Sequence, residues 1–339
     1  MPLEAPHRLL KAPARVALAP MEGVLEATCR DLITAQGGWD FCVTEFVRVS
    51  HEKLPARVFH RICPELRQGS VTPTGVPVHL QLLGSDPESM ALNAQVAVKA
   101  GTQVLDLNFG CPAKIVNRHG GGARLLTEPD RVHAIAAAVV EAVRPLGVPV
   151  TAKMRLGYAD ASLALENAQA LEAAGIAQLV VHARTKAQGY QPPAHWEAIA
   201  ALTEALKLPI LANGEIWTLA DYQRCVSVSG VKDVMLGRTA LADPWLAQQI
   251  KAADQGQAFA PSAFSDVLKL MLAWCQAGGE IYPERVQVMR LKQWLRLLIP
   301  RWGTQAKMLF TSAKLATDRA TLFKLLAEAV ASCEVQAKE

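Results

Sequence analysis

Residues 104–126 show the pattern that decides the fold: they read VLDLNFGCPAKIVNRHGGGARLL. A short apolar run leads into a polar, glycine-containing loop, and the Ala- and Val-rich stretch that follows, Pro129–Arg144, is typical of a helix. The same succession recurs over roughly the first 250 residues. Continuous apolar runs of this kind are typical of strands buried on both faces, as in a parallel sheet.

The number of these runs distinguishes between two α/β architectures. The runs are Val16–Pro20, Phe41–Val47, Val78–Leu83, Val104–Phe109, Val150–Leu156, Gln178–Ala183, Pro209–Asn213 and Asp233–Gly237. Predicted helices between them include Glu88–Ala100, Pro129–Arg144, Ser162–Ala174 and Trp196–Leu206. Eight strand–helix units are what a (β/α)8 TIM barrel requires. The alternative is a doubly wound open sheet, but no GxGxxG motif follows the first run, so we favour the barrel.

The pattern changes after Ile250. A polar stretch, 251–262, leads into a segment that shows only helical periodicity from Phe264 to Lys338, with breaks near Gly278, Pro283 and Pro300–Gly303. Three or four helices fit this segment. We therefore predict two domains, a barrel over residues 1–250 and a small helical bundle over residues 251–339.

Composition excludes several classes of protein. Of the 339 residues 51% are hydrophobic and 19% charged, which excludes a disordered chain. The sequence contains no apolar run of the ~18 residues that a membrane span needs, and the N-terminus lacks the features of a secretory signal. Seven widely spaced cysteines without a CxxC pair indicate neither a disulfide framework nor a zinc site, and eight histidines include no HExxH pair. We expect a cytoplasmic, monomeric protein without a metal.

The charge is unevenly distributed along the chain. Between Arg285 and Lys324 there are nine basic residues and one acidic residue, Asp318, so this segment has a net charge of +8. Because the whole chain is at +4, the remainder carries −4. The two parts are expected to face different partners.

Polar residues gather where the predicted strands end, which is where barrels of this kind place their working residues. They include Pro20-Met21-Glu22, Arg48, Gln81, Asp106, Asn108, Cys111, Lys153, Arg155, His182, Arg184, Asn213-Gly214-Glu215 and Gly237-Arg238. This distribution predicts a polar ligand. Asn213-Gly214 and Gly237-Arg238 follow the seventh and eighth strands, where a phosphate often binds, although tight turns alone would also explain these glycines.

Three single residues have competing interpretations. Lys153 ends an apolar strand and suits a Schiff base, an anion or cofactor contact, or a charge on the barrel rim. His182 suits a ligand contact or a structural histidine. Cys111 lies between Gly110 and Pro112 on a constrained turn, and a thiol with an ordinary pKa of ~8.5 can donate a proton at neutral pH.

Six motifs in chain order resemble the flavin-dependent tRNA-dihydrouridine synthases. They are LAPMEGV at 18–24, DLNFGCPAKIVNRHGGGARLL at 106–126, KMRLGY at 153–158, VVHARTKAQGY at 180–190, ANGEIW at 212–217 and VMLGR at 234–238. Further motifs, TEFVRV at 44–49, VFHRICPEL at 58–66 and RLKQWL at 290–295, resemble the dihydrouridine synthase C branch, which acts on uridine 16 of the tRNA D-loop.

This resemblance implies a barrel that holds FMN and a helical domain that grips tRNA. NADPH would reduce the flavin, the reduced flavin would pass a hydride to C6 of uracil, and a cysteine would give a proton to C5. It implies the following roles: Cys111 as the proton donor; Pro20, Met21, Glu22, Gln81, Lys153, His182, Asn213, Gly214, Glu215, Gly237 and Arg238 as flavin contacts; Asn108 and Arg155 near the target base; and Arg48, Arg290, Lys292 and Lys314 as tRNA contacts.

The chain departs from the family pattern at Arg124, where the family has a small residue, and the extension before Val16 matches nothing in the family and is expected to fray. The basic segment fits an RNA backbone, whose binding is salt-sensitive. The target base must flip out of its stack to reach a flavin.

Three rival functions follow from the same residues. The first is a flavin barrel that reduces a small pyrimidine or enone, which would not need the basic segment. The second is a non-catalytic tRNA-binding protein, which would not need Cys111, Lys153 and His182. The third is a lyase that uses Lys153 as a Schiff base.

Overall fold

The structure, a computed structural model, describes residues 13–278 and 282–336. Contacts divide the chain into two compact units. The first comprises Met1–Pro20 and Trp39–Leu236, and the second comprises Met21–Gly38 and Gly237–Glu339. The extension expected to fray lies largely outside the described residues.

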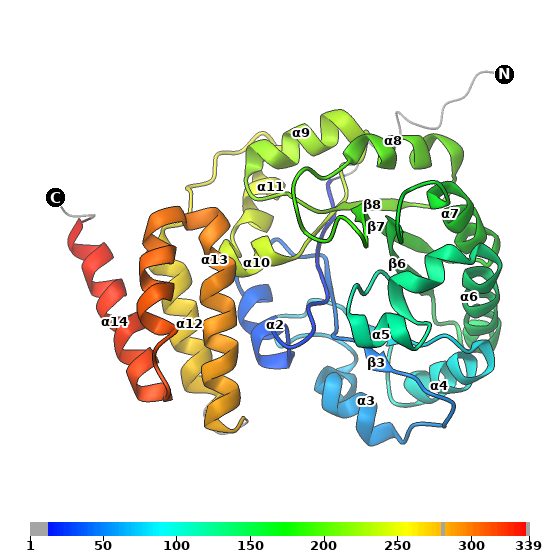
Figure 1. The fold of residues 1–339 in the computed structure, drawn as a ribbon, viewed down its shortest axis with the longest axis horizontal. Helices are drawn as coiled ribbons and strands as arrows, with labels where there is room; N and C mark the ends of the chain where they lie inside the picture. The colour runs from blue at the N-terminus through cyan, green and yellow to red at the C-terminus, as the bar shows by residue number, and fades with distance from the viewer. Residues whose placement is uncertain (1–12, 279–281, 337–339) are drawn as a thin grey trace. The chain divides into compact units, whose positions relative to one another are not determined.

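The first unit contains a closed parallel barrel, as the count of eight apolar runs predicts (Figure 1). Its strands are β1 (Val16–Leu18), β2 (Phe41–Val43), β4 (Val78–Leu83), β5 (Leu105–Phe109), β6 (Val150–Gly157), β7 (Gln178–Thr185), β8 (Ile210–Asn213) and β9 (Val234–Leu236). Pairing of β1 with β9 and of β2 with β4 closes the ring, and the short strand β3 (Val47–Arg48) adds to β4. The (β/α)8 TIM barrel is therefore confirmed, and the open-sheet alternative is excluded.

Helices lie between successive strands of this unit. They are α3 (Ala56–Ile62), α4 (Pro87–Lys99), α5 (Lys114–Arg118), α6 (Pro129–Val143), α7 (Ala164–Ala173), α8 (Trp196–Ala205) and α9 (Leu219–Ser229), with 3-10 turns η1 (Pro64–Gln68), η2 (Gly122–Thr127) and η3 (Arg144–Leu146). The four helices predicted by residue range all form, and each end lies within two residues of its predicted position.

The barrel strands are buried along nearly their whole length, which explains their continuous apolar runs. Every residue of β4 and β7 is buried, including the polar ones. Ala17, Phe41, Val180, Leu211 and Met235 belong to one apolar cluster built from β1, β2, β7, β8 and β9. A polar side chain inside such a strand must find its hydrogen-bond partners in the barrel interior.

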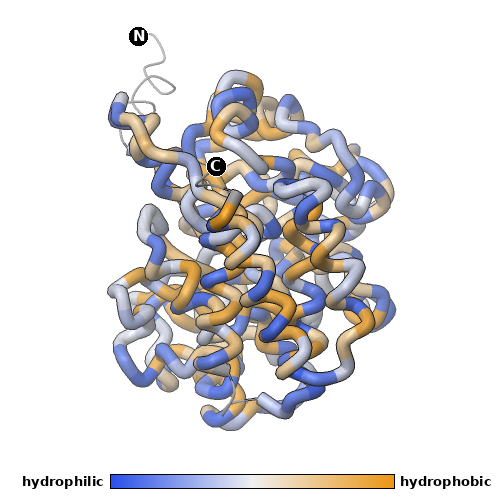
Figure 2. Tube along the Cα trace, turned by 90° about the vertical axis from the view of Figure 1, so that its left-hand side faces the viewer, coloured by the Kyte–Doolittle hydropathy of each residue, from blue (hydrophilic) through white to orange (hydrophobic). Residues whose placement is uncertain are grey.

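The second unit is helical. Its helices are α2 (Ala27–Thr34), α10 (Arg238–Ala242), α11 (Leu246–Asp254), α12 (Phe264–Gly278), α13 (Glu284–Ala313) and α14 (Arg319–Gln336). Figure 2 shows hydrophobic and hydrophilic residues alternating along helices of the chain, the pattern of amphipathic packing. From Phe264 onward the described residues form three helices, which agrees with the prediction of three or four. The expected break at Pro300–Gly303 is a kink, because α13 continues through non-helical geometry at Gly303 (φ 53°, ψ −125°).

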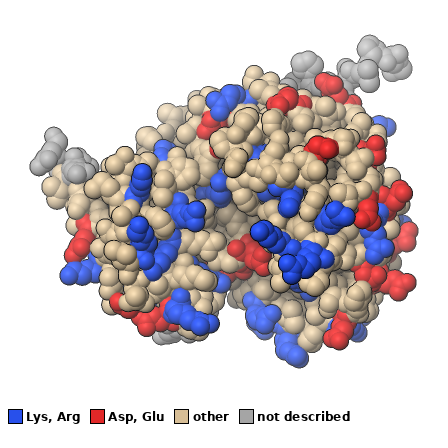
Figure 3. Space-filling view, in the orientation of Figure 1, with Lys and Arg blue, Asp and Glu red and all other residues tan. Residues whose placement is uncertain are grey.

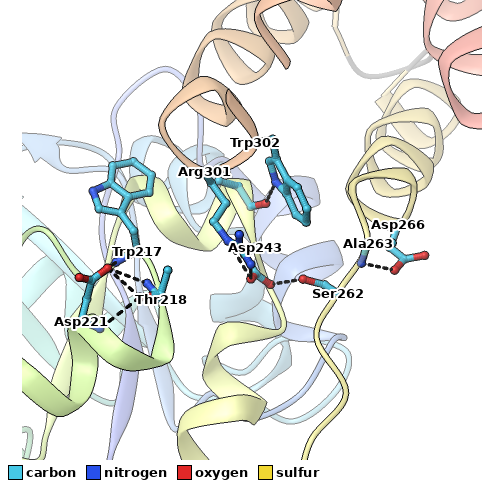
Figure 4. A network of polar contacts seen from close by, with 10 residues as sticks. Trp217, Thr218, Asp221, Asp243, Ser262, Ala263, Asp266, Arg301 and Trp302 are labelled. Carbon is cyan, nitrogen blue, oxygen red and sulfur yellow. Dashed lines mark hydrogen bonds and ion pairs between the residues drawn. The ribbon is translucent and has the colours of Figure 1, made fainter. Parts of the chain in front are cut away.

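Two tryptophans and one carboxylate hold the second unit together around the end of α10. The indole N–H of Trp294 donates to the carbonyl of Leu241 at 2.8 Å, and that of Trp302 donates to the carbonyl of Ala242 at 2.6 Å. The next residue, Asp243, accepts from Ser262 at 2.7 Å and pairs with Arg301 at 3.3 Å (Figure 4). Carbonyls at a helix end lack partners within the helix, so these contacts from α13 satisfy them.

The two compact units do not meet at residue 250, where the sequence predicts the domain boundary. By their contacts α10, α11 and the segment Met21–Gly38 belong with the C-terminal helices. The division into folding domains itself stays a prediction. None of the helices among the described residues has the length and apolar character needed to cross a membrane.

Candidate active site

Buried and partly buried polar side chains of adjacent barrel strands lie beside one another in the first unit. The strand pairing places Gln81 beside Asp106, Asn108 beside Lys153, and His182 beside both Arg155 and Asn213. Gln81 is fully buried, and His182 and Asn213 are each 6% exposed. The barrel therefore brings together predicted site residues from β4 to β8.

Cys111 lies two residues beyond the end of β5 and is 9% exposed. Its backbone N–H donates to Asn108 Oδ1 at 2.8 Å, and its carbonyl accepts from Ala123 N at 3.1 Å and from Asn117 Nδ2 at 2.9 Å. A Cβ at Gly122, where φ is +60°, would lie 2.7 Å from the Cys111 carbonyl oxygen, so a side chain does not fit there. The turn that carries the thiol is thus fixed from both sides.

Lys153 is a largely buried amine near the thiol. Its pKa is lowered from 10.5 to about 7, chiefly by burial and then by the like charge of Arg155, while Asp106 and Cys111 oppose the shift. Lys153 Nζ donates to Asn213 Oδ1 at 3.0 Å, and Asn213 Nδ2 donates to the carbonyl of Met235 at 2.7 Å. The Asn213 amide is therefore oriented so that its oxygen faces the amine.

Arg155 joins the loops that follow two strands. Its guanidinium donates to the carbonyls of Gly110, Thr185 and Gly189 at 3.0, 3.0 and 2.9 Å. The residue is 2% exposed. The guanidinium carbon also lies 5.0 Å from the centre of the Tyr190 ring, which is itself 5.9 Å from the ring of His182. This residue, predicted to lie near a substrate base, holds the Cys111 loop to the loop after β7.

His182 and Glu215 share a buried guanidinium. Arg184 is fully buried, forms an ion pair with Glu215, and places Nη1 3.3 Å from His182 Nε2. Because a guanidinium can only donate, His182 Nε2 accepts and its ring proton lies on Nδ1. At Gly214, where φ is +114°, a Cβ would lie 2.8 Å from His182 Cδ2, so glycine is required for the close approach to the imidazole.

The remaining predicted site residues lie in both units. In the first unit Pro20 follows β1, and Arg48 is exposed at the end of β3. In the second unit Met21 and Glu22 begin the segment before α2, and Gly237 and Arg238 begin α10. The carbonyl of Met21 accepts from the backbone N–H groups of Val24 and Leu25 at 3.2 and 3.0 Å.

The three predicted tRNA contacts in the helical unit differ in exposure. Lys314 is exposed, and its carbonyl accepts from Lys292 Nζ at 3.0 Å. The side chain of Arg290 is only 16% exposed, 3.8 Å from a carboxylate oxygen of Glu26 and 4.4 Å from the ring centre of Tyr282. Glu26 also accepts from Trp274 and Tyr282, so Arg290 belongs to a buried polar cluster.

Most of the basic segment faces solvent. Five of its nine cations are exposed, namely Arg285, Arg296, Lys307, Lys314 and Lys324. Figure 3 shows Lys and Arg side chains over α13, and a second group over α5 in the first unit. Arg124 is exposed, and its guanidinium carbon lies 5.4 Å from the ring centre of Tyr158, with Lys186 Nζ 4.7 Å from the same ring. Arg124 thus adds to the positive surface of the barrel unit.

Sequence reasoning noted Asp106 and Arg184 as polar residues at strand ends but gave them no role. Both are buried against predicted site residues, Asp106 against Gln81 and Arg184 against His182. The signal in the sequence was a charge inside an otherwise apolar strand, which requires a partner in the interior. Within residues 13–278 and 282–336, His, Cys, Asp and Glu side chains form no group of three that could hold a metal ion.

Comparison with known proteins identifies the family. The dihydrouridine synthase (Dus) family matches residues 17–300. The tRNA-dihydrouridine(16) synthases of Pseudomonas putida and Pseudomonas syringae are 50% and 48% identical, over 92% and 90% of this chain and 96% and 95% of theirs. That of Neisseria meningitidis serogroup B is 42% identical over 94% of this chain and 95% of its own.

Among solved structures, the YdjI aldolase of Escherichia coli K12 covers 88% of this chain and 94% of its own at 15% identity and a TM-score of 0.42, too low to bear on function. The family match spans the barrel and much of the helical segment, and it agrees with the resemblance seen in the motifs. The chain belongs to the dihydrouridine synthase family and is an oxidoreductase of that family.

Proposed function

We propose that the chain reduces uridine 16 in the D-loop of tRNA to 5,6-dihydrouridine in the cytoplasm, with FMN bound at the barrel and NADPH as the reductant. The observation that carries the proposal is Cys111, whose backbone is fixed at the end of β5 beside a buried cluster of amide and cationic side chains. The names of the relatives supply the tRNA substrate and the position.

The buried side chains at the ends of β4 to β8 fit the polar edge of a flavin. Gln81, Lys153 and Asn213 provide amide and amine groups, and His182 adds an imidazole whose Nε2 lies against Arg184. Gly214 keeps the space beside the His182 ring free of a side chain. When bound, FMN supplies the hydride that adds to C6 of uracil.

The protein supplies the proton and holds the base. Addition at C6 leaves negative charge on the pyrimidine, and the Cys111 thiol gives its proton to C5. Asn108 and Arg155 fix the turn that presents the thiol, since Asn108 binds the Cys111 N–H and Arg155 binds the carbonyl of Gly110. Lys153, with a pKa lowered to about 7, changes charge readily when an anionic group binds beside it.

The exposed cations of α13 and α14, together with Lys314 between these helices, would bind the tRNA backbone, as would Arg48 on the barrel. Neutralised phosphates make such binding salt-dependent. We propose that the protein acts as a monomer. The target uridine must flip out of its stack before it reacts, because the flavin cannot reach a stacked base.

Mass spectrometry of digested tRNA tests the proposal. Unmodified tRNA is incubated with the protein, FMN and NADPH, and each uridine that gains two hydrogens is mapped. A gain at position 16 is expected. Cys111→Ala should lower the rate by about 100-fold or more while FMN and tRNA still bind, and Cys333→Ala, a change in α14, should leave it unchanged. A gain elsewhere in the D-loop would overturn the position, and no gain from a yellow protein that oxidises NADPH would favour a small-molecule reductase.

A further inference from the structure

A continuous chain of side-chain hydrogen bonds runs from a buried carboxylate to the Cys111 turn. Asp106 Oδ2 accepts from Gln81 Nε2 at 2.7 Å, and Gln81 Oε1 accepts from Asn108 Nδ2 at 2.7 Å. Asn108 Oδ1 then accepts from the backbone N–H groups of Gly110 at 3.0 Å and Cys111 at 2.8 Å. All of these residues lie in the barrel unit.

The two ends of this chain fix the orientation of both amides. A backbone N–H can only donate, so Asn108 must turn its oxygen toward the Cys111 turn and its NH2 toward Gln81. At the other end the Asp106 oxygen accepts, so Gln81 must turn its NH2 toward Asp106 and its oxygen toward Asn108. Each link agrees with the next, and reversing either amide would set two donors or two acceptors against each other.

Asp106 is held as an acceptor by its surroundings. It is 1% exposed, and its second oxygen accepts from the Thr151 hydroxyl at 2.6 Å. Burial raises its pKa, whereas the hydrogen bonds from Gln81 and Thr151 and the charge of Lys153 oppose the rise. The oxygen that faces Gln81 is an acceptor in either protonation state, provided that a proton, when present, lies on the oxygen toward Thr151.

We infer that Asp106 is a positioning residue for the Cys111 thiol, acting through Gln81 and Asn108. This inference rests on the proposed role of Cys111 as the proton donor. Asp106 does not touch the thiol turn itself; it fixes the direction of the Gln81 amide, which in turn orients the Asn108 oxygen that binds the Cys111 N–H. Without the acceptor at Asp106, the NH2 of Gln81 loses its buried partner and only Asn108 still orients the Gln81 amide, so the Asn108 oxygen that binds the turn is held less firmly.

Substitutions at Asp106 and Thr151 separate this role from mere packing. Asp106→Leu removes the acceptor. Asp106→Asn can keep an oxygen toward Gln81 and donate its NH2 to Thr151 Oγ1, because that hydroxyl can still donate to the carbonyl of Leu105, 3.3 Å away. Thr151→Val removes the other hydrogen bond of the Asp106 carboxyl and leaves the Asp106–Gln81–Asn108 relay, the chain of hydrogen bonds described above, intact.

Two readouts are measured on the flavin-loaded protein. The first is the alkylation rate of Cys111 by iodoacetamide, resolved by peptide mass spectrometry, with the partly exposed Cys333 as the internal reference. The second is dihydrouridine formation, separated into kcat and KM for tRNA. In Asp106→Leu, iodoacetamide should alkylate Cys111 about tenfold faster relative to Cys333, because the turn is looser. The same variant should have a kcat about tenfold lower, with KM for tRNA unchanged. Asp106→Asn and Thr151→Val should stay within about twofold of the wild type in both.

A double substitution tests whether the effect passes through Gln81. Gln81→Leu removes both hydrogen bonds of the Gln81 amide, to Asp106 and from Asn108, and serves also if Asp106→Leu does not fold. Adding Asp106→Leu to Gln81→Leu should change the Cys111 alkylation rate no further. Additive effects, equal effects of Thr151→Val and Asp106→Leu, or a folded Asp106→Leu with wild-type alkylation would each overturn the inference. A wild-type protein that forms no dihydrouridine would overturn the proposed function alone, because alkylation still reports on the relay.

Discussion

Replacement of Arg155 by methionine should destabilise the barrel unit strongly. The guanidinium is 2% exposed and donates to three loop carbonyls, those of Gly110, Thr185 and Gly189. Methionine keeps an unbranched apolar stem but has no donor, so it leaves these carbonyls without the cation. A hydrogen bond from a charged donor is worth about 1.5 kcal/mol or more, so we expect a loss of about 4 kcal/mol in the free energy of unfolding.

Thermal unfolding followed by circular dichroism measures this loss. At about 2–4 °C per kcal/mol for a domain of this size, the melting temperature of Arg155→Met should fall by roughly 10 °C. Arg124→Met is the matched control, because Arg124 is exposed and its contact with the Tyr158 ring is worth about 0.5–1 kcal/mol. Removal of the like charge should also raise the pKa of Lys153 above about 7.

The melting temperatures of Arg155→Met and Arg124→Met test whether the three hydrogen bonds of Arg155 hold the loops together. If Arg155→Met melts within about 2 °C of Arg124→Met, the three hydrogen bonds do not hold the loops, and Arg155 does not have the structural role that its contacts indicate. Arg155→Lys should fall between the wild type and Arg155→Met, because an ammonium cannot reproduce the planar fork that serves three carbonyls.

Three further outcomes follow from the site and the helical unit. The pKa of Lys153 is lowered from 10.5 to about 7, so above pH 7 the amine of the free protein is neutral, and FMN binding should then take up a proton and weaken by up to about tenfold per pH unit. Calorimetry in buffers of different ionisation enthalpy measures this proton uptake, and Lys153→Met should abolish the dependence of FMN affinity on pH. Gly214→Ala should displace His182 and weaken FMN binding, measured by fluorescence, whereas Gly189→Ala, with φ +61° and nothing within 4 Å of its Cβ, should only cost stability. Trp294→Phe should lower the free energy of unfolding by about 1–3 kcal/mol, measured in urea, because the buried carbonyl of Leu241 loses its donor.

The sequence determined the barrel, because its signal is local and repeated. Each buried strand appears as an apolar run, and the eight runs agree with the eight barrel strands to within a few residues. The same local signal predicted the helices and the interruption near Gly303. The position of Cys111 after the fourth run also followed from the sequence, since barrel chemistry gathers at the ends of strands.

Only the tertiary structure decided which polar side chains serve one another. Arg155 binds carbonyls 30 to 45 residues away along the chain, and Asp106 binds Gln81 at a separation of 25. The packing of Met21–Gly38 with the C-terminal helices, through Glu26 and Trp274, spans 248 residues. Local patterns hold no information about such pairs, because a buried polar group is satisfied by whatever the fold brings beside it.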